Sequence, residues 1–392
     1  MLKRVITIIN ILGEGPKASG TRARGWFDSY YLSSHLSQNE SCKMASFVCQ
    51  VYDSVVTEHE SPSISPTRHL GPYSPYAICS DYGAGMSLPP HRVDYLPMAD
   101  RPTISWPNDA KVALWVAPNV EHYEYLPPRD ALRNPWPRSP HPEVQGYSHR
   151  DYGNRVGFWR MLDVLDEHNV RCTASTNLAI FEHYPDIGKA MADRNWEIMS
   201  HGIYNTRYLS SLTEQEEREF YVDCVDTLRR HTGQKLKGML GPAVSNTIRT
   251  PDLMSEAGLI YHADWLHDDQ PIPIKVEGGP LISVPYSIEL NDVPVFLQHH
   301  DTKDFVEMVK AQFDTLHEEG KTSGRVMALA LHPYLMGMPH RIEGLEEILD
   351  YLLGRDDVWQ ATASQIAEHF IDHHYEEFVD HAEVISAVRD AS

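Results

Sequence analysis

Residues 157–202, "GFWRMLDVLDEHNVRCTASTNLAIFEHYPDIGKAMADRNWEIMSHG", indicate the fold class of this chain, because helical and strand patterns alternate along them. Apolar residues recur at helical spacing over 157–170, and the short run 171–177 is typical of a strand. A second helix at 184–195 and a second strand at 196–202 follow in the same order. Alternation of this kind predicts parallel strands with helices packed outside them.

The same alternation continues on both sides of this stretch. Further strand-like runs begin or lie at 111–125, 235–242, 260–265, 280–287, 325–333 and 358–362, and helix-like runs at 213–233, 250–259, 303–320, 341–354 and 363–374. About seven parallel strands predict an α/β fold, a distorted (β/α) barrel with its helices outside. We expect this barrel domain at 100–375 and a short C-terminal tail at 376–392.

Residues 1–85 differ from the rest of the chain. They are rich in Ser, Gly and Pro and keep no helix or strand period, so we expect a poorly ordered N-terminal extension. The opening "MLKRVITIINILGEG" (1–15) has the basic and apolar residues of a signal peptide, but no small-residue cleavage site follows closely. The five cysteines show no metal-binding spacing and fit reduced thiols. We therefore expect a cytoplasmic protein, with secretion as the alternative.

Charge and hydropathy restrict the partners of the chain. The 55 Asp and Glu residues outnumber the 34 Lys and Arg residues, which gives a net charge of -21. An acidic surface of this size repels phosphate backbones, so no nucleic acid partner is expected. No run approaches the ~18 consecutive apolar residues of a membrane-spanning helix, so no membrane is expected either.

Polar side chains follow several of the predicted strands. In a barrel of parallel strands, chemistry takes place at the carboxyl ends of the strands, on the loops that lead into the helices. The residues at these positions are Glu121 and His122 after the first strand, His201, Tyr204 and Asn205 after the third, Asp264 and Trp265 after the fifth, Asn291 and Asp292 after 280–287, and His332 after 325–333. Carboxylates, imidazoles and amides on one rim are what acid–base or metal-assisted hydrolysis requires.

Several short motifs indicate a family. "SHG" (200–202), "ADW" (263–265) and "LALHP" (329–333) occur in this order, together with the longer "YGNRVGFWR" (152–160) and "VPYSIELND" (284–292). Over about 100–375 the chain resembles the polysaccharide deacetylase superfamily with its NodB homology domain. Within it, the chain is most similar to the branch of metal-independent allantoinases and cyclic-imide hydrolases. The resemblance implies a distorted (β/α) barrel and hydrolysis of a carbon–nitrogen bond.

The chain departs from the deacetylase pattern at its metal ligands. Glu121 stands where the pattern has an Asp pair, Asn205 stands where it has a second histidine, and "MLGPAV" (239–244) lacks the usual arginine. Glu121, His201 and Asn205 could still form a weak zinc site, but an amide is a poor zinc ligand. We therefore expect no cofactor, with a divalent metal such as zinc at this weak site as the alternative.

The resemblance suggests roles for the rim residues. We expect Glu121 to activate water as a base or ligand, with His201 orienting it, and His332 to act as general acid or oxyanion donor. Asp264 would orient one of the two histidines. The substrate would be bound by the pocket walls His122, Tyr204, Asn205 and Trp265.

Three functions remain open at this point. The leading hypothesis is ring opening of a small cyclic amide, either a cyclic imide or an allantoin-like ureide, and the long Pro-rich loop 124–153 favours it as a lid over a small pocket. The first alternative is a metal-dependent deacetylase of N-acetylated sugars or chitin-like oligomers. The second is a catalytically silent, carbohydrate-binding barrel. The family also implies a homo-oligomer.

Overall fold

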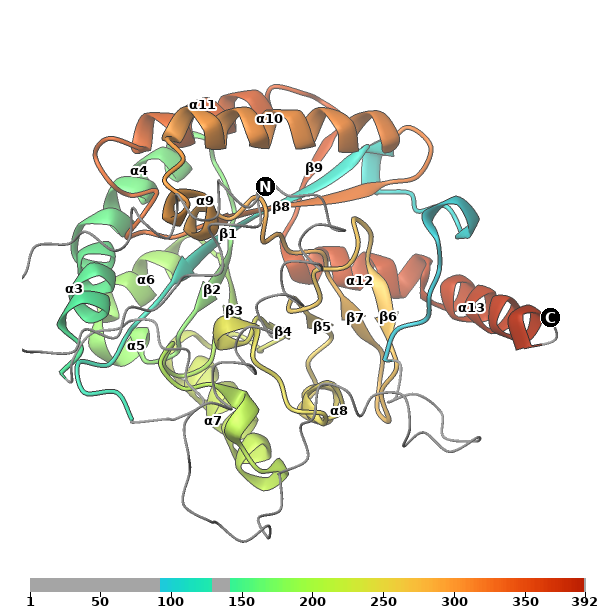
Figure 1. Ribbon diagram of the computed structural model, residues 1–392, viewed down its shortest axis with the longest axis horizontal. Helices are drawn as coiled ribbons and strands as arrows, with labels where there is room; N and C mark the ends of the chain where they lie inside the picture. The colour runs from blue at the N-terminus through green and yellow to red at the C-terminus, as the bar shows by residue number, and fades with distance from the viewer. Residues whose placement is uncertain (1–91, 129–141, 391–392) are drawn as a thin grey trace, which may run out of the picture. The chain divides into compact units, whose positions relative to one another are not determined.

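The central sheet of the computed structural model, which describes residues 92–128 and 142–390, is mostly parallel (Figure 1). Its order is β6-β7-β5-β4-β3-β2-β1-β8, with β9 beside β1, and only β6 and β7 pair antiparallel. The strands are β1 (Val112–Val120), β2 (Thr173–Thr176), β3 (Glu197–Ser200), β4 (Gly238–Met239), β5 (Tyr261–His262), β6 (Ile272–Ile274), β7 (Leu281–Ser283), β8 (Arg325–Leu331) and β9 (Val358–Gln360). The prediction of a distorted (β/α) barrel is confirmed, while the extension at 1–85 lies outside the described residues.

The end strands of the sheet are β6 and β8, and the segment after β7 contacts both β1 and β8. Trp115 on β1 donates from its indole nitrogen to the carbonyl oxygen of Pro285 at 3.0 Å, and Asn119 donates to the Tyr286 hydroxyl at 2.9 Å. Asn291 then forms a single parallel bridge with Ala330 on β8. Side chains, this bridge and isolated backbone hydrogen bonds, such as that from the Val326 amide to the Asp269 carbonyl oxygen at 2.8 Å, therefore close the barrel here in place of a strand ladder.

Helices surround the sheet, and Figure 1 shows α10 and α11 side by side along one edge of the molecule. The predicted helices are α4 (Phe158–Glu167), α6 (Pro185–Asp193), α7 (Glu214–Thr232), α8 (Thr250–Glu256), α10 (Thr302–Glu319), α11 (Ile342–Leu353) and α12 (Ala363–His373). The additional ones are α3 (Val144–Tyr152), α5 (Ile180–His183), α9 (Asp292–Leu297) and α13 (Tyr375–Asp390). No helix in the described ranges is long and apolar enough to cross a membrane.

Local sequence signals explain where the longest predicted helix begins and ends. Thr213 caps α7 by accepting from the Glu216 amide, and Glu216 returns a bond to the Thr213 amide, as in a capping box. The helix ends at Gly233, whose φ of 73° is left-handed and suits glycine.

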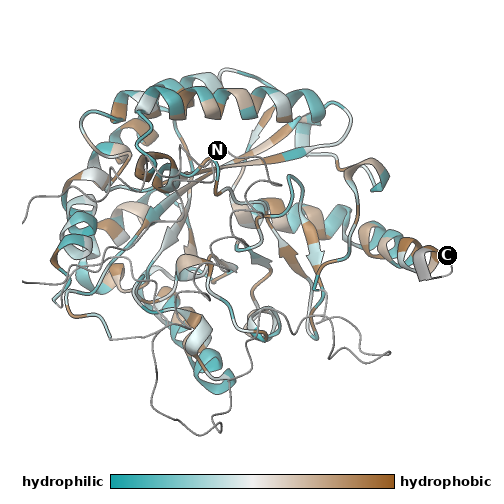
Figure 2. Cartoon of the chain, in the orientation of Figure 1, coloured by the Kyte–Doolittle hydropathy of each residue, from teal (hydrophilic) through white to brown (hydrophobic). Residues whose placement is uncertain are grey.

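Apolar side chains fill both faces of the sheet, and the strands are largely brown in Figure 2. Inside the barrel, Trp115 and Tyr261 pack with Phe370 of α12. Phe378 belongs to the same cluster and is fully buried. The sequence predicted that the last helix ends at 374 and that a tail follows, but the chain continues as α13 because Phe378 has a place in the core.

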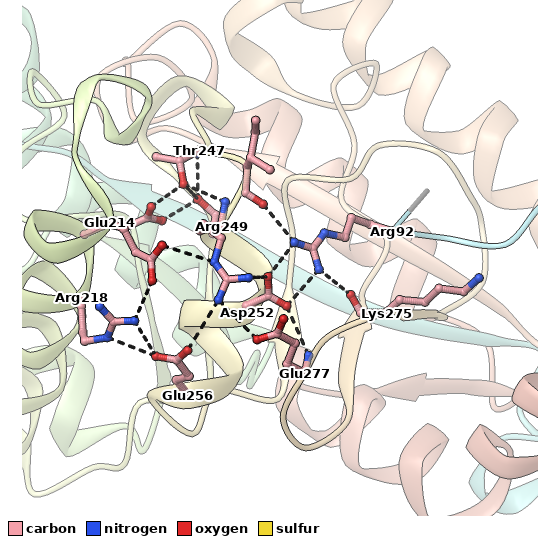
Figure 3. Close-up of polar contacts among 12 residues, drawn as sticks. Arg92, Glu214, Arg218, Thr247, Arg249, Asp252, Glu256, Lys275 and Glu277 are labelled. Atoms are coloured by element: carbon pink, nitrogen blue, oxygen red, sulfur yellow. Dashed lines mark hydrogen bonds and ion pairs between the residues drawn. The ribbon is translucent and has the colours of Figure 1, made fainter. Parts of the chain in front are cut away.

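A buried ion-pair network ties the first described residues to the barrel (Figure 3). The Asp252 carboxylate on α8 is fully buried and accepts two bonds from Arg92, at 2.6 and 2.9 Å, and one from Arg249 at 2.8 Å. The Glu277 amide donates to it at 3.2 Å. Burial alone would raise the pKa of Asp252, but these bonds and charges lower it overall. Asp252 therefore stays ionised and fixes Arg92 in place.

Candidate active site

Three predicted residues meet at the carboxyl ends of neighbouring strands. Glu121 follows β1, His201 follows β3 and His332 follows β8, and β8-β1-β2-β3 is a continuous run of the sheet. The Oε1 atom of Glu121 lies 3.4 Å from His332 Nε2 and 3.7 Å from His201 Nε2. All three residues are buried, with at most 6% of their surface exposed. The structure thus places a carboxylate between two imidazoles.

The tautomer of His201 follows from its partners. Its Nδ1 lies 2.8 Å from the Leu240 carbonyl oxygen, which can only accept, so Nδ1 holds a hydrogen and Nε2 is the ring nitrogen that faces Glu121. Gly202 follows with a φ of 71°, and a Cβ there would meet the Pro242 ring. Glycine is needed at this turn, because it lets the chain turn away from the imidazole.

His332 is held by Asp292, at the start of α9. The Asp292 carboxylate accepts from His332 Nδ1 at 2.7 Å and from the His332 amide at 2.8 Å, and it is fully buried. Burial alone would lower the pKa of His332, but the charge and hydrogen bond of Asp292, with those of Glu121, raise it to about 9. His332 is therefore an imidazolium at neutral pH.

Glu121 is correspondingly an ionised carboxylate. Burial would raise its pKa, but its hydrogen bonds to His201 and His332 and the charges of His332 and Arg150 hold it well below the usual range. The second oxygen, Oε2, accepts from Arg150 Nε at 3.3 Å. Glu121 can therefore accept a proton from water through Oε1 while Oε2 stays bound.

Sequence reasoning missed Arg150 and gave Asp292 no role. Arg150 lies on α3, and its guanidinium stacks between the rings of Tyr123 and Tyr334, with Cζ 4.0 and 4.2 Å from the two centroids. The π turn Gly153–Gly157 follows α3, and a Cβ at Gly153 or Gly157 would collide with the loop after β8. The glycines of "YGNRVG" were the available signal, because they mark a close approach of backbone next to the site.

Asp264 orients neither His201 nor His332, so that prediction is wrong. Its Oδ1 accepts from the Gly241 amide and its Oδ2 from Asn246 Nδ2, both at 2.7 Å. It also lies 3.0 Å from His262 Nε2. A carboxylate after β5 instead fixes the loop after β4, because the two strands are neighbours in the sheet.

The predicted pocket walls divide into two groups. His122 stacks on His183 with centroids 4.4 Å apart, and Tyr204 lies 5.7 Å from His122. Burial and the neighbouring His183 lower the pKa of His122 to about 4, so its ring is neutral at neutral pH. Asn205 is buried beside this group, and its backbone N–H donates to the carbonyl oxygen of His122.

Trp265 belongs to the other group. Its indole nitrogen donates to His262 Nδ1 at 3.0 Å, next to Asp264. Tyr286 lies between the two groups, and its hydroxyl accepts from Asn119 on β1. Burial raises the pKa of Tyr286, the bond with Asn119 lowers it, and the charges of Asp292, Glu121 and Asp264 raise it further.

The donor set does not fit a divalent cation, although the family pattern implies one. One oxygen of Glu121 binds a guanidinium, which leaves Oε1 alone as a ligand, and the ring of His332 is held through Nδ1 by Asp292. His201 and the amide of Asn205 would be the remaining donors. Within 92–128 and 142–390, no group of three or more His, Cys, Asp or Glu residues could hold a metal ion.

The sequence of this chain is similar to that of known proteins. Residues 147–262 match the family model for polysaccharide deacetylase. A Schizosaccharomyces pombe protein that bears the name of a polysaccharide deacetylase is 28% identical over 299 residues, which cover 68% of this chain and 92% of the relative.

Solved structures of similar fold include a polysaccharide deacetylase and an allantoinase. A Pseudomonas aeruginosa PAO1 protein assigned as a polysaccharide deacetylase is 27% identical with a TM-score of 0.60, over 70% of this chain and 95% of the other. The PuuE allantoinase is 25% identical with a TM-score of 0.64, over 74% and 99%. The fold and site therefore define a hydrolase of carbon–nitrogen bonds other than peptide bonds. The chain contains a polysaccharide deacetylase (NodB homology) domain, which the family model, the fission yeast relative and the solved structures all indicate.

Proposed function

We propose that this chain opens the ring of a small cyclic amide, a cyclic imide or an allantoin-like ureide above all, by hydrolysing its carbon–nitrogen bond. One observation carries the proposal: the imidazolium of His332, held by Asp292, faces the ionised carboxylate of Glu121 at 3.4 Å. Hydrolysis of an amide needs a base for the water and an acid for the leaving nitrogen. This pair supplies both from side chains alone.

The proton balance of the reaction closes within this pair. Glu121 takes a proton from water as the water oxygen attacks the carbonyl carbon, and the carbonyl oxygen becomes an oxyanion. His332 donates its Nε2 proton to the ring nitrogen as the carbon–nitrogen bond breaks. The proton on Glu121 then returns to His332, 3.4 Å away, which restores the starting state. The product has a carboxyl group at one end and the freed nitrogen at the other.

Two observations support a small substrate. The donor set does not fit the divalent cation of the deacetylase pattern. The structural similarity includes an allantoinase over 99% of its length. The central part of the proposed lid, 129–141, lies outside the described residues, so the lid gives no support here.

The alternative is a metal-dependent deacetylase of N-acetylated sugars or chitin-like oligomers. The name of the matching family and that of the fission yeast relative favour it. Such an enzyme needs a metal ion to polarise the acetyl carbonyl. The two functions differ in two ways that can be measured. The deacetylase would need a metal ion and act on an oligomer, whereas the ring-opening enzyme would need no metal ion and act on a small cyclic amide.

The test is hydrolysis by the full chain of allantoin, succinimide, dihydrouracil and an N-acetylglucosamine oligomer, each with and without a chelator. We expect ring opening that the chelator leaves unchanged. Deacetylation of the oligomer that the chelator abolishes would establish the alternative instead. Loss of turnover in Glu121→Gln and His332→Gln, with folding unchanged, would assign the activity to this site. If the chain hydrolyses none of these amides, the result would favour the catalytically silent, carbohydrate-binding barrel instead.

A further inference from the structure

The guanidinium of Arg150 is held more firmly than a surface side chain would be. It lies between two tyrosine rings, and its Nη2 donates to the hydroxyls of Tyr123 and Tyr334, both at 3.2 Å. Only 16% of the Arg150 side chain is exposed, and 5% of the Glu121 side chain. A planar cation stacked on two aromatic faces loses most of its rotational freedom. Its position relative to Glu121 is therefore fixed before a substrate arrives.

Because this cation is fixed, the two carboxylate oxygens of Glu121 have different partners. Arg150 Nε binds Oε2 at 3.3 Å, whereas Oε1 faces the two imidazoles. An unheld carboxylate rotates about its last bond and offers either oxygen to its surroundings. The bond from Arg150 stops this rotation, so that only Oε1 is available to the reacting water. The guanidinium also places a permanent positive charge beside the carboxylate that a metal ion would need as a ligand.

We propose that Arg150 is a positioning residue of the reaction: clamped between Tyr123 and Tyr334, it fixes Glu121 and takes the place that a divalent cation would otherwise occupy beside it. This inference rests on the proposed acid–base hydrolysis. The inference goes beyond that proposed function, because it assigns to Arg150 the positive charge beside Glu121 that a metal ion would otherwise supply. The clamp joins α3 to the loops after β1 and β8, so the base and the acid share one support.

The surroundings of Arg150 make it accessible to a rescue experiment. A cavity of about 160 Å³ adjoins it, lined by Gln145, Gly146, His149, Arg150, Val293, Leu297, Tyr334 and Leu335. Truncation of the arginine extends this cavity towards Glu121. A guanidinium ion from solution can then occupy the vacated position, whereas urea has nearly the same shape but no charge.

The experiment compares Arg150→Ala, Arg150→Lys and Arg150→Gln with Arg155→Ala, a control at an exposed arginine just beyond the same helix. With the ring amide that the wild type turns over, Arg150→Ala should lose about 10²-fold in kcat with little change in KM, because the base is misplaced. Guanidinium should restore part of this kcat at concentrations where urea restores none. Arg150→Lys should keep more kcat than Arg150→Gln, and Arg155→Ala should match the wild type.

Two results would overturn the inference. One is an Arg150→Gln protein with the kcat of Arg155→Ala, and the other is a folded Arg150→Ala protein that guanidinium and urea affect equally. If Arg150→Ala does not fold, the comparison of the Lys and Gln variants decides in its place.

A measurement without substrate separates this inference from the proposed function. The carboxyl-carbon NMR signal of Glu121, assigned by its loss in Glu121→Gln, should move in Arg150→Gln and stay in place in Arg155→Ala. An unmoved signal would show that the clamp does not act on Glu121. If the wild type hydrolyses no amide, the proposed function fails, and this comparison still decides the role of Arg150.

Discussion

The proton on His332 depends first on Asp292, with Glu121 as the second neighbour that raises the pKa of this imidazole. The raised pKa of about 9 means that the acid form prevails below that pH and is lost as the pH rises through it. We expect kcat/KM to fall on the basic side near pH 9. In Asp292→Asn the charge that raises the pKa is removed, so this limb should move down towards the ordinary histidine value of 6.5.

A pH–rate profile of both proteins measures this shift. His340→Ala is the control, because His340 lies exposed in the loop that follows His332. A basic limb that stays near pH 9 in Asp292→Asn would mean that His332 is not the acid, or that Asp292 does not tune it.

Single residues could be predicted from the sequence when their position in the chain decides their place. Glu121, His201 and His332 each follow a strand, and parallel strands bring their ends together. Arg150 and Asp292 could not be assigned in this way, because their partners lie 29 and 40 residues away across the barrel. Asp264 was misassigned for the same reason: its partners on the next strand were invisible in the sequence.

The π turn after α3 is the element that brings the acid to the site. A methyl group at Gly157 would collide with the Pro333 carbonyl, directly after His332. Gly157→Ala should therefore displace this loop, lower the free energy of unfolding by about 1–3 kcal/mol and reduce kcat. Gly279→Ala is the control, since nothing lies within 4 Å of the added carbon there. Equal urea midpoints and equal kcat for both variants would contradict this account of the turn.

Most elements were predicted because their apolar periods are long. β6 was missed because its three residues, Ile272–Ile274, include a proline and pair antiparallel at the end of the sheet. α3 was missed because "VQGYSHRDY" has no apolar stripe and only Gly146 of it is buried. Contacts across the fold, above all those of Arg150, stabilise α3 more than its own sequence does.

For the whole molecule, the network around Asp252 anchors the start of the described chain to the barrel. Arg92→Ala removes two charged hydrogen bonds from a fully buried carboxylate, while Arg249 and the Glu277 amide remain. We expect a loss of about 2 kcal/mol in the free energy of unfolding, with kcat unchanged.

Urea unfolding checks this value, with Lys189→Ala as the control. Lys189 belongs to an exposed pair with Asp193 and should cost less than about 1 kcal/mol. Because the pKa of Asp252 is lowered, its contribution is present at neutral pH and is lost as the pH falls through the folded value. Equal losses in both variants would show that the network does not anchor this segment.

The junction of β8 with the segments that flank β6 and β7 gives the barrel one weak side and one strong side. The strands that hold His332, Glu121 and His201 form an unbroken parallel ladder from β8 to β3, whereas one bridge, isolated backbone hydrogen bonds and a few side chains cross this junction. Breathing of the barrel should follow this asymmetry. Backbone amides of residues 285–291 should exchange with deuterium sooner than those of β1 and β2. Opening on that side would admit a substrate or release a product. The ladder from β8 to β3 would stay closed meanwhile, so Glu121, His201 and His332 would keep their spacing.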